Sequence, residues 1–297
     1  LVDAQTRGVD VRVVLDRTNK LPTPTAAYTV LHNGLTSGHL TICSANGHGS
    51  CIGNGINHNK FYLFSQLSDG STDVVVQSSA NLTTSQMKQH NNMIVSRGDH
   101  ALYSGYLDYW NDLKAQHKNL NYYRTIVGDY RTRTYAFPRA SGDTIISILN
   151  NVHCHAGAST LLVNMAFFAD NRIDVAHKLV EKHNQGCSVK ANLRDDGTAS
   201  APGASVLHTL KHGGVSVRLF APDADHDQFT IHSKILLVDS AYEGASGVSH
   251  RKLVFMGSHN YTDGALQHND ETLMRIDDPG IFAAYLANWN TIRSLAP

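Results

Sequence analysis

The chain of 297 residues has a mass of 32.4 kDa, which suits one large domain or two domains of about 150 residues each. Hydrophobic residues make up 41% and charged residues 17%, so the chain can bury a full core and is not intrinsically disordered. The 25 Lys and Arg balance the 25 Asp and Glu, which argues against a protein that holds nucleic acid mainly by an overall basic field. No apolar run reaches the roughly 18 residues that a membrane span requires.

Two stretches of the chain repeat the same order of expected elements. Residues 7–16 predict the end of a helix, a glycine cap and a buried strand, and residues 185–193 predict the same. A second helix and strand follow each of them, over residues 25–43 and 204–220. This alternation predicts an α/β protein with two similar halves, each with a mostly parallel sheet, related by an internal pseudo-two-fold axis.

The repeat also indicates where the halves divide and how they differ. We expect a first half over residues 1–136 and a second half over residues 137–297. The second half opens with a strand at 160–166 and a helix at 174–183, whereas only seven residues precede Gly8. We therefore expect the first half to lack its opening strand and helix, which would expose an edge of its sheet.

Four cysteines fall into two pairs. Cys43 and Cys51 flank a loop rich in Gly, Ser and Asn, and Cys154 and Cys187 each precede an apolar, strand-like run. This pattern favours two disulfides, Cys43–Cys51 and Cys154–Cys187, and a secreted protein. A zinc site is the competing interpretation because two His flank Cys154, but the CxxC spacing is missing. We expect no metal and no other cofactor.

Both halves then carry a His-x-Lys pair followed by a Ser-x-Asn pair. The members are His58, Lys60, Ser79 and Asn81 in the first half, and His232, Lys234, Ser258 and Asn260 in the second. On a strand, residues two apart project to the same face, so each His and Lys would act together.

This set of side chains suits a phosphodiester substrate. One imidazole can attack phosphorus to form a phosphohistidine, and the other can protonate the leaving oxygen and then activate water or an alcohol. The two Lys can stabilise the charge of the transition state without a metal, and we assign the Asn and Ser residues to phosphate binding.

The motifs resemble those of the phospholipase D superfamily, secreted bacterial type, whose signature is His-x-Lys-x4-Asp followed by Gly-Ser-x-Asn. The second copy matches this signature through Asp239 and Gly257, whereas the first has Ser65 in place of Asp and Ser78 in place of Gly. The resemblance covers nearly the whole chain and implies the αβαβα sandwich of that superfamily. We expect Asp239 to be structural, bonding backbone behind the site.

The resemblance also implies an acidic residue that orients a motif histidine of the opposite half. Similar segments, Gln-His-Asn-Asn and Gln-His-Asn-Asp-Glu, follow the two Ser-x-Asn pairs. We expect Glu271 to support His58, with Asp270 as the alternative partner, and Asn92 to face His232. A carboxylate fixes the tautomer, so His58 is the expected nucleophile and His232 the general acid and base.

The function implied is that of a monomeric phosphodiesterase that hydrolyses a phospholipid head-group ester, with transfer to alcohols open to the same intermediate and peripheral contact with a membrane surface. The alternative is a metal-independent endonuclease of the same superfamily acting on nucleic acid. The balanced charge favours lipid, whereas Ser-Ser-x-Asn in the first half weakens the lipid case. A non-catalytic phosphate-binding module is the third interpretation, against which both complete motif sets argue.

Two further segments lie near the motifs. The glycine-rich stretch 47–55 is expected to form a disulfide-pinned rim of the site, although its backbone N–H groups also suit a phosphate cradle. The segment between Asp239 and Leu253 lacks apolar content, which predicts a mobile surface loop near the site.

Overall fold

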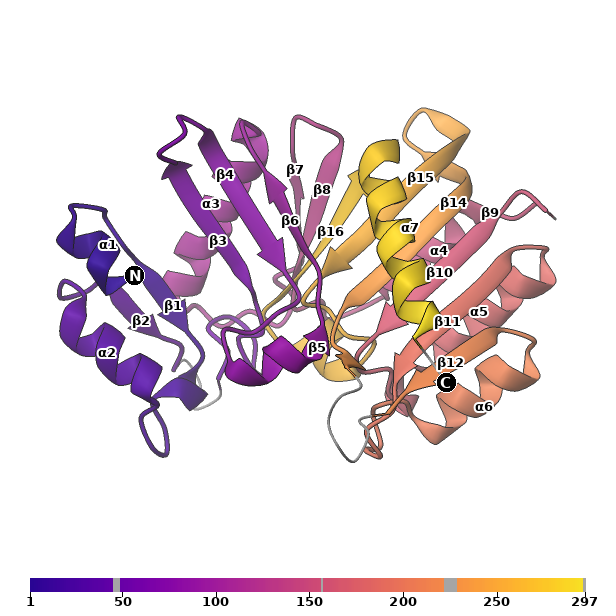
Figure 1. Cartoon of the computed structure of the whole chain (residues 1–297), viewed down its shortest axis with the longest axis horizontal. Coiled ribbons are helices and arrows are strands. Elements are labelled where there is room, and N and C mark those ends of the chain that lie inside the picture. Colours follow the sequence, from indigo (N-terminus) through magenta and orange to yellow (C-terminus); the bar gives the residue numbers. More distant parts are fainter. Residues whose placement is uncertain (45–48, 156, 222–228, 296–297) are drawn as a thin grey trace.

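The computed structural model describes residues 1–44, 49–155, 157–221 and 229–295. Its helices and strands form two α/β halves that stand side by side, the first in indigo to magenta and the second in pink to yellow (Figure 1). The expected α/β class and its two halves are therefore confirmed.

A nine-stranded sheet runs through the second half and includes two strands from the end of the first. Its strands, in order across the sheet, are β12 (Ser216–Phe220), β11 (Ser188–Arg194), β10 (Thr160–Met165), β14 (Lys234–Gly244), β15 (Gly247–Gly257), β16 (Glu271–Asp277), β8 (Thr132–Phe137) and β7 (Arg124–Val127), and β9 (Val152–His153) pairs with β14. Only β12, β11 and β10 are parallel neighbours; from β10 to β7 every pairing is antiparallel.

The expectation of mostly parallel sheets is therefore wrong. Parallel strands need a crossover connection, and the helices α5 (Ile173–Asn184) and α6 (Ala204–His212) supply it only for β10 to β12. Beyond the His-x-Lys pair, the chain returns through the β14–β15 hairpin instead. The segment between Asp239 and Leu253 belongs to that hairpin and is not the expected loop, because main-chain pairing with β15 continues from Asp239 to Gly244 and Tyr242 is buried in the core.

The first half contains three smaller sheets. β1 (Val13–Leu15) and β2 (Leu40–Ile42) are parallel; β3 (Phe61–Gln66), β4 (Thr72–Ser78) and β6 (Met93–Ser96) are antiparallel; β5 (Gln89–His90) pairs with β13 (Thr230–Ile231) of the second half. Among the described residues no strand lies between β1 and β3, the position that β10 holds between β11 and β14. The large sheet crosses the boundary expected at residue 136, because β7 and β8 pair with β16.

The remaining helical segments are short or cover the sheets. They are α1 (Val2–Thr6), η1 (Arg17–Asn19), α2 (Ala26–Gly34), η3 (Thr84–Lys88), α3 (His100–Ala115), α4 (Thr144–Asn150), η4 (Asp170–Arg172), η5 (Gly264–His268) and α7 (Pro279–Ser294). Among the described residues, none of the helices combines the length and the apolar composition that a membrane crossing demands.

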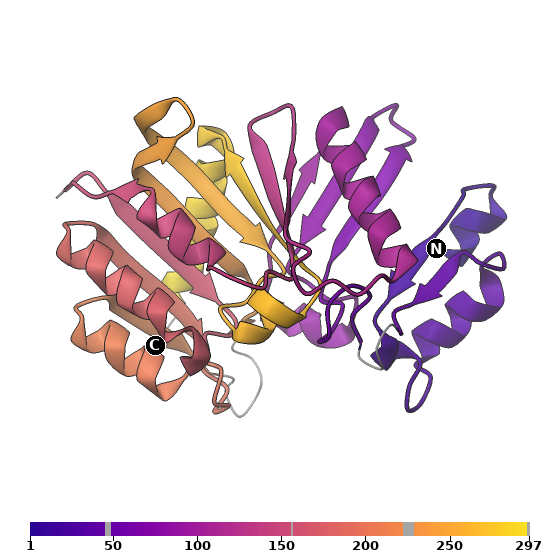
Figure 2. The same cartoon turned by 180° about the vertical axis from the view of Figure 1, so that it is seen from behind.

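Two apolar layers cover the large sheet. On one face, α4 and α5 pack their buried residues against the strands, and Figure 2 shows these helices in front of the sheet. On the other face lie α3 and α7; α7 begins after the N-cap Asp278 and buries Phe282, Tyr285 and Trp289, which share one side of the helix. Because Val75 of β4 and Leu102 of α3 belong to this second layer, both halves share one core.

Candidate active site

The two His-x-Lys pairs lie where the two halves meet. Backbone hydrogen bonds tie each histidine to the opposite half: the His58 N–H donates to the Asp270 carbonyl at 2.9 Å, and the His232 N–H donates to the His90 carbonyl at 3.0 Å. Short parallel pairings continue both links, between Asn57 and Asp270 and between β5 and β13. In Figure 1 these segments meet at the lower centre, near the label β5. Each half therefore holds the histidine of the other in place.

Groups from both halves influence one another electrostatically. Burial lowers the pKa of His232 to about 2, and the positive charges of Lys234 and Lys60 lower it further, as does His58. The charge of Lys234 in turn contributes to lowering the pKa of His58, after burial and Lys60. The structure thus brings the four expected His and Lys residues to one site.

A buried carboxylate orients His58. Its Nδ1 lies 2.9 Å from each carboxylate oxygen of Glu271, whose side chain is fully buried. A ring N–H donated there leaves Nε2 with its lone pair. Burial lowers the pKa of His58 despite the opposing charge of Glu271. Burial acts to raise the pKa of Glu271, but the hydrogen bond from His58 and the charge of Lys60 help to keep it below its ordinary value. A neutral His58 beside an ionised Glu271 is the state suited to nucleophilic attack.

An amide takes the corresponding place beside His232. The ring Nδ1 lies 3.0 Å from Oδ1 of Asn91, and 3.2 Å from Nζ of Lys234. The expectation that Asn92 faces His232 is therefore wrong by one residue. The expectation counted an equal number of residues from each Ser-x-Asn pair. In the structure, the backbone contact to His232 comes from His90, so the side chain beside the ring is that of the next residue, Asn91.

The two lysines are buried, which lowers the pKa of each ammonium group. Burial lowers the pKa of Lys60 to about 8, while Glu271 and Asp16 act in the opposite direction. Burial lowers the pKa of Lys234 further below its ordinary value, and Lys60 adds to the effect. Each ammonium donates to the carbonyl of the histidine two residues before it. An anion bound between these lysines would restore their charge and be held by it.

The asparagines and the serines of the Ser-x-Asn pairs differ in their hydrogen bonding. The side chain of Asn81 makes no hydrogen bond among the described residues, and Oδ1 of Asn260 is buried without a partner, so both amides can turn to a phosphate. The hydroxyls of Ser79 and Ser258 are instead fully buried and engaged. The Asn92 N–H donates to Ser79 at 3.0 Å, and the Thr272 N–H donates to Ser258 at 3.0 Å. The structure therefore gives the two serines contacts that fix the following strands.

Asp239 lies on β14 behind the site, but its partners differ from those expected. Its carboxylate accepts from Nε2 of His250 and from Nζ of Lys252, both at 2.6 Å, on the adjacent strand β15. It stabilises the hairpin through side chains and not through backbone groups, because β14 and β15 already satisfy each other's backbone.

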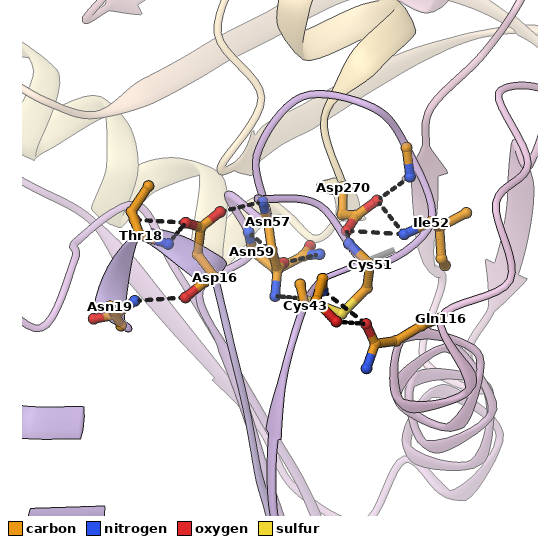
Figure 3. Close-up of a disulfide and its surroundings, with 12 residues drawn as sticks. Asp16, Thr18, Asn19, Cys43, Cys51, Ile52, Asn57, Asn59, Gln116 and Asp270 are labelled. Carbon is orange, nitrogen blue, oxygen red and sulfur yellow. Dashed lines mark hydrogen bonds between the residues drawn. A yellow bond between two sulfur atoms is a disulfide. The ribbon is translucent and has the colours of Figure 1, made fainter. Parts of the chain in front are cut away.

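Asp270, the alternative partner of His58, has a different role. Its carboxylate accepts the backbone N–H groups of Cys51, Ile52 and Gly53 at 2.5, 3.2 and 2.8 Å (Figure 3). The Cys43–Cys51 disulfide pins this loop, and the Cys154–Cys187 disulfide is also present. Burial raises the pKa of Asp270 to about 7, against these three hydrogen bonds. The loop thus cradles an internal carboxylate; Gly47, at the start of the glycine-rich stretch, lies outside the described residues.

Sequence reasoning missed three residues of the site. Arg194 ends β11, and its charge lowers the pKa of His232 and Lys234. Asp16, the residue at the matching place of the first repeat, raises the pKa of Lys60 and accepts the Asn57 N–H at 2.8 Å. The internal repeat itself could have revealed this pair, since both residues stand eight positions after the glycine that opens each copy.

The third missed residue is His259, between Ser258 and Asn260. Its ring is buried, its centroid lies 4.4 Å from that of Phe137 in a tilted contact, and neither nitrogen has a hydrogen-bond partner. Burial lowers its pKa to about 3, which keeps the ring neutral. No sequence signal marks it, because it occupies the variable position of the motif.

This fold and site define a class of protein: duplicated α/β proteins in which two His-x-Lys pairs meet at one site. The chain belongs to the phospholipase D superfamily of phosphodiester-acting proteins. Residues 1–113 and 146–292 match the family model described as "Cardiolipin synthase, PLD-like domain".

Individual relatives are distant in sequence. The chain is 23% identical over 131 residues to a mitochondrial cardiolipin hydrolase of Chlamydomonas reinhardtii, a match that takes in 44% of this chain and 51% of that protein. The chain thus spans about half the length of this curated relative. A phosphatidylserine synthase of Haemophilus influenzae superposes over 99% of this chain and 75% of its own, with a TM-score of 0.63 and 14% identity. A polyphosphate kinase of Porphyromonas gingivalis covers 98% of this chain and 42% of its own, with a TM-score of 0.60 and 13% identity.

Proposed function

We propose that this protein is a secreted, monomeric phosphodiesterase that hydrolyses the head-group ester of a phospholipid through a phosphohistidine intermediate. The observation that carries the proposal is the difference between the two histidines: a buried carboxylate orients His58, whereas an amide orients His232. That difference supports His58 as the nucleophile and His232 as the group that transfers protons.

In the first step, Nε2 of His58 attacks phosphorus and the bond to the head-group oxygen breaks. The leaving oxygen takes a proton from the ring of His232, so neutral alcohol departs. In the second step, water loses a proton to His232 and attacks phosphorus, the phosphorus–nitrogen bond breaks, and His58 is regenerated. An alcohol in place of water would give transfer by the same route.

The protonated state that His232 needs depends on the substrate. The lysines that depress its pKa are the groups that would contact the non-bridging oxygens of phosphate, together with Asn81 and Asn260. A bound phosphodiester anion offsets their charge and raises the pKa of His232. Substrate binding thereby prepares the acid for the first step.

Four exposed apolar side chains near the motifs favour lipid over nucleic acid. Leu82 follows Asn81 and is 80% exposed, and Met87 on η3 is 78% exposed. Ile56 and Phe229 are also exposed, two residues before His58 and three before His232. We call these four residues the apolar rim. Exposed apolar groups around a site suit contact with lipid, whereas nucleic-acid grooves are lined by cations. The names of the matched family and of the curated relative, which both refer to cardiolipin, point the same way.

The test is an assay in EDTA that offers phosphatidylcholine and cardiolipin vesicles, single-stranded DNA and double-stranded DNA to the same enzyme. We expect head-group release from lipid and loss of that release in His58→Ala. Cleavage of DNA without release from lipid would replace the proposal with the endonuclease alternative. Absence of all turnover, with phosphate binding retained, would support a binding module instead.

A further inference from the structure

A basic cavity lies at the C-terminal end of β16, away from the His-x-Lys site. It has a volume of about 450 Å³, and its lining includes Arg131, His250, Arg251, Arg275 and Asp277. Arg131 is on the turn between β7 and β8, and the other four are on β15 and β16. In Figure 1, the β7–β8 and β14–β15 turns stand at the top, opposite β5.

The positive charges of this cavity exceed the negative ones. Arg251 donates to Asp277 at 2.5 Å, which uses the one carboxylate of the lining. Among the described residues, Arg131 and Arg275 form no ion pair with any acid. In a chain with equal numbers of acids and bases, this is a concentrated local excess.

Strand register adds an unfavourable contact beside the cavity. Arg275 stands directly opposite Arg133 in the antiparallel pairing of β16 with β8. Like charges in directly opposite positions destabilise a sheet, and the Nε of each arginine is buried without a hydrogen-bond partner. Neither a described carboxylate nor a hydrogen bond relieves this pair, whereas a bound anion would.

The cavity is separate from the site of the motifs. Arg275 follows Glu271 by four positions on β16, which corresponds to about 13 Å along a strand. Its residues are absent from the phosphodiester mechanism above. A ligand held here therefore does not need to be the substrate.

We propose that this cavity is a second anion-binding site, selective for ligands that carry phosphate with at least two negative charges. Guanidinium groups match phosphate oxygens bidentately, so Arg131 and Arg275 can each take one face of such a group. Asp277 holds Arg251 and limits the site to strongly charged ligands. The phosphate can belong to a soluble diphosphate or to a phosphomonoester lipid head group.

The experiment measures binding of inorganic pyrophosphate by calorimetry at low salt. The wild-type chain should bind at this cavity and, separately, at the lysines of the motif site. The double variant Arg131→Gln/Arg275→Gln should lose the first event, with affinity down about tenfold or more, and keep the second. Lys60→Gln should do the reverse, and Arg7→Gln, an exposed arginine of the first half, should change neither.

Further measurements show whether the double variant is still folded and whether the ligand is a lipid or a soluble molecule. Turnover of a soluble phosphodiester should be unchanged in the double variant, and the melting temperature without ligand should rise, because the repulsion between Arg133 and Arg275 is removed. Sedimentation with phosphatidic acid or phosphatidylcholine vesicles, in a His58→Ala background, distinguishes a lipid ligand from a soluble one. The proposal is overturned if pyrophosphate and phosphatidic acid bind the double variant as they bind the wild type. Absence of phosphodiester turnover by the wild type would overturn only the proposed function.

Discussion

At the scale of single residues, one atom type distinguishes the two histidines. A carboxylate oxygen of Glu271 and an amide oxygen of Asn91 accept from equivalent ring positions, at 2.9 and 3.0 Å. Both can fix a tautomer, but only the carboxylate stabilises the positive charge that develops on a nucleophilic imidazole. We therefore expect the carboxylate partner to decide which histidine is the nucleophile.

Replacing Glu271 by Gln tests this assignment. We expect kcat on a soluble phosphodiester to fall by about 10²–10⁴-fold with little change in KM, because the imidazolium loses its counter-charge. Asn91→Gln, which keeps an amide at the other position, is the matched control and should have a much smaller effect. A rapid-quench experiment should trap phosphate on His58; an adduct on His232 of the intact protein would reverse the roles.

The pH profile follows from two lowered pKa values. His58 must be neutral to attack, and burial holds its pKa below the ordinary value of 6.5, so the acid limb of kcat/KM should lie below pH 6.5. Lys60 must be charged to hold phosphate, and burial lowers its pKa to about 8, so activity should decline as the pH rises through about 8. Deprotonation of His232, whose pKa rises when phosphate is bound, contributes to the decline as well, so the limbs belong to the coupled site as a whole.

Lys60→Arg identifies the basic limb. Because a guanidinium remains charged throughout this range, the decline should move to higher pH while the acid limb stays in place. A basic limb that does not move in steady-state measurements from pH 4 to 11 would show that another group controls it.

At the scale of elements, the loop after the disulfide explains how the site is held. Asp270 binds three consecutive N–H groups of this loop with its side chain and the His58 N–H with its carbonyl. Asp270, the alternative partner expected for His58, thus links this loop to His58 through its side chain and its backbone carbonyl.

Asp270→Ala should therefore cost stability as well as activity. Three buried N–H donors lose their acceptor, which we expect to lower the free energy of unfolding by about 3 kcal/mol or more. Asp270→Asn retains one acceptor oxygen and should lose less. Urea unfolding of both variants checks the order; equal stability of the alanine variant and the wild type would contradict it.

Sequence patterns reached the motif residues more reliably than their surroundings. Spacing alone located both His-x-Lys pairs, and the family resemblance pointed to Glu271. The expectation of Asn92 in place of Asn91 was wrong because the spacing of residues in the sequence does not show which backbone contacts set the register. Arg194 and His259 act through burial and through charges across the site, which no linear pattern records. The large sheet is mostly antiparallel because β10, β14, β15, β16, β8 and β7 each run opposite to the next strand, and hydrophobic periodicity carries no signal of strand direction.

At the scale of the whole molecule, the two halves share one core, the apolar rim lies on segments that adjoin the motifs in sequence, and the basic cavity lies at the far end of β16. The rim comes from segments 56, 82–87 and 229, which lie on both sides of the interface between the halves. A flat lipid surface could therefore touch several of these segments at once, which a single exposed side chain would not permit.

The double variant Leu82→Ser/Met87→Ser tests whether the apolar rim contacts the lipid surface without taking part in catalysis. Burying each of these side chains in lipid is worth about 1.5–3 kcal/mol, so the double variant should lose roughly tenfold or more of its activity on phospholipid vesicles. Its turnover of a soluble, monomeric phosphodiester should match that of the wild type, because neither side chain belongs to the His, Lys and Asn set. Val30→Ser/Val127→Ser, two exposed apolar residues away from the motifs, is the matched control. Vesicle activity that falls equally in both double variants would show that the rim has no special role, and DNA cleavage reduced by the rim substitutions would shift the substrate toward nucleic acid.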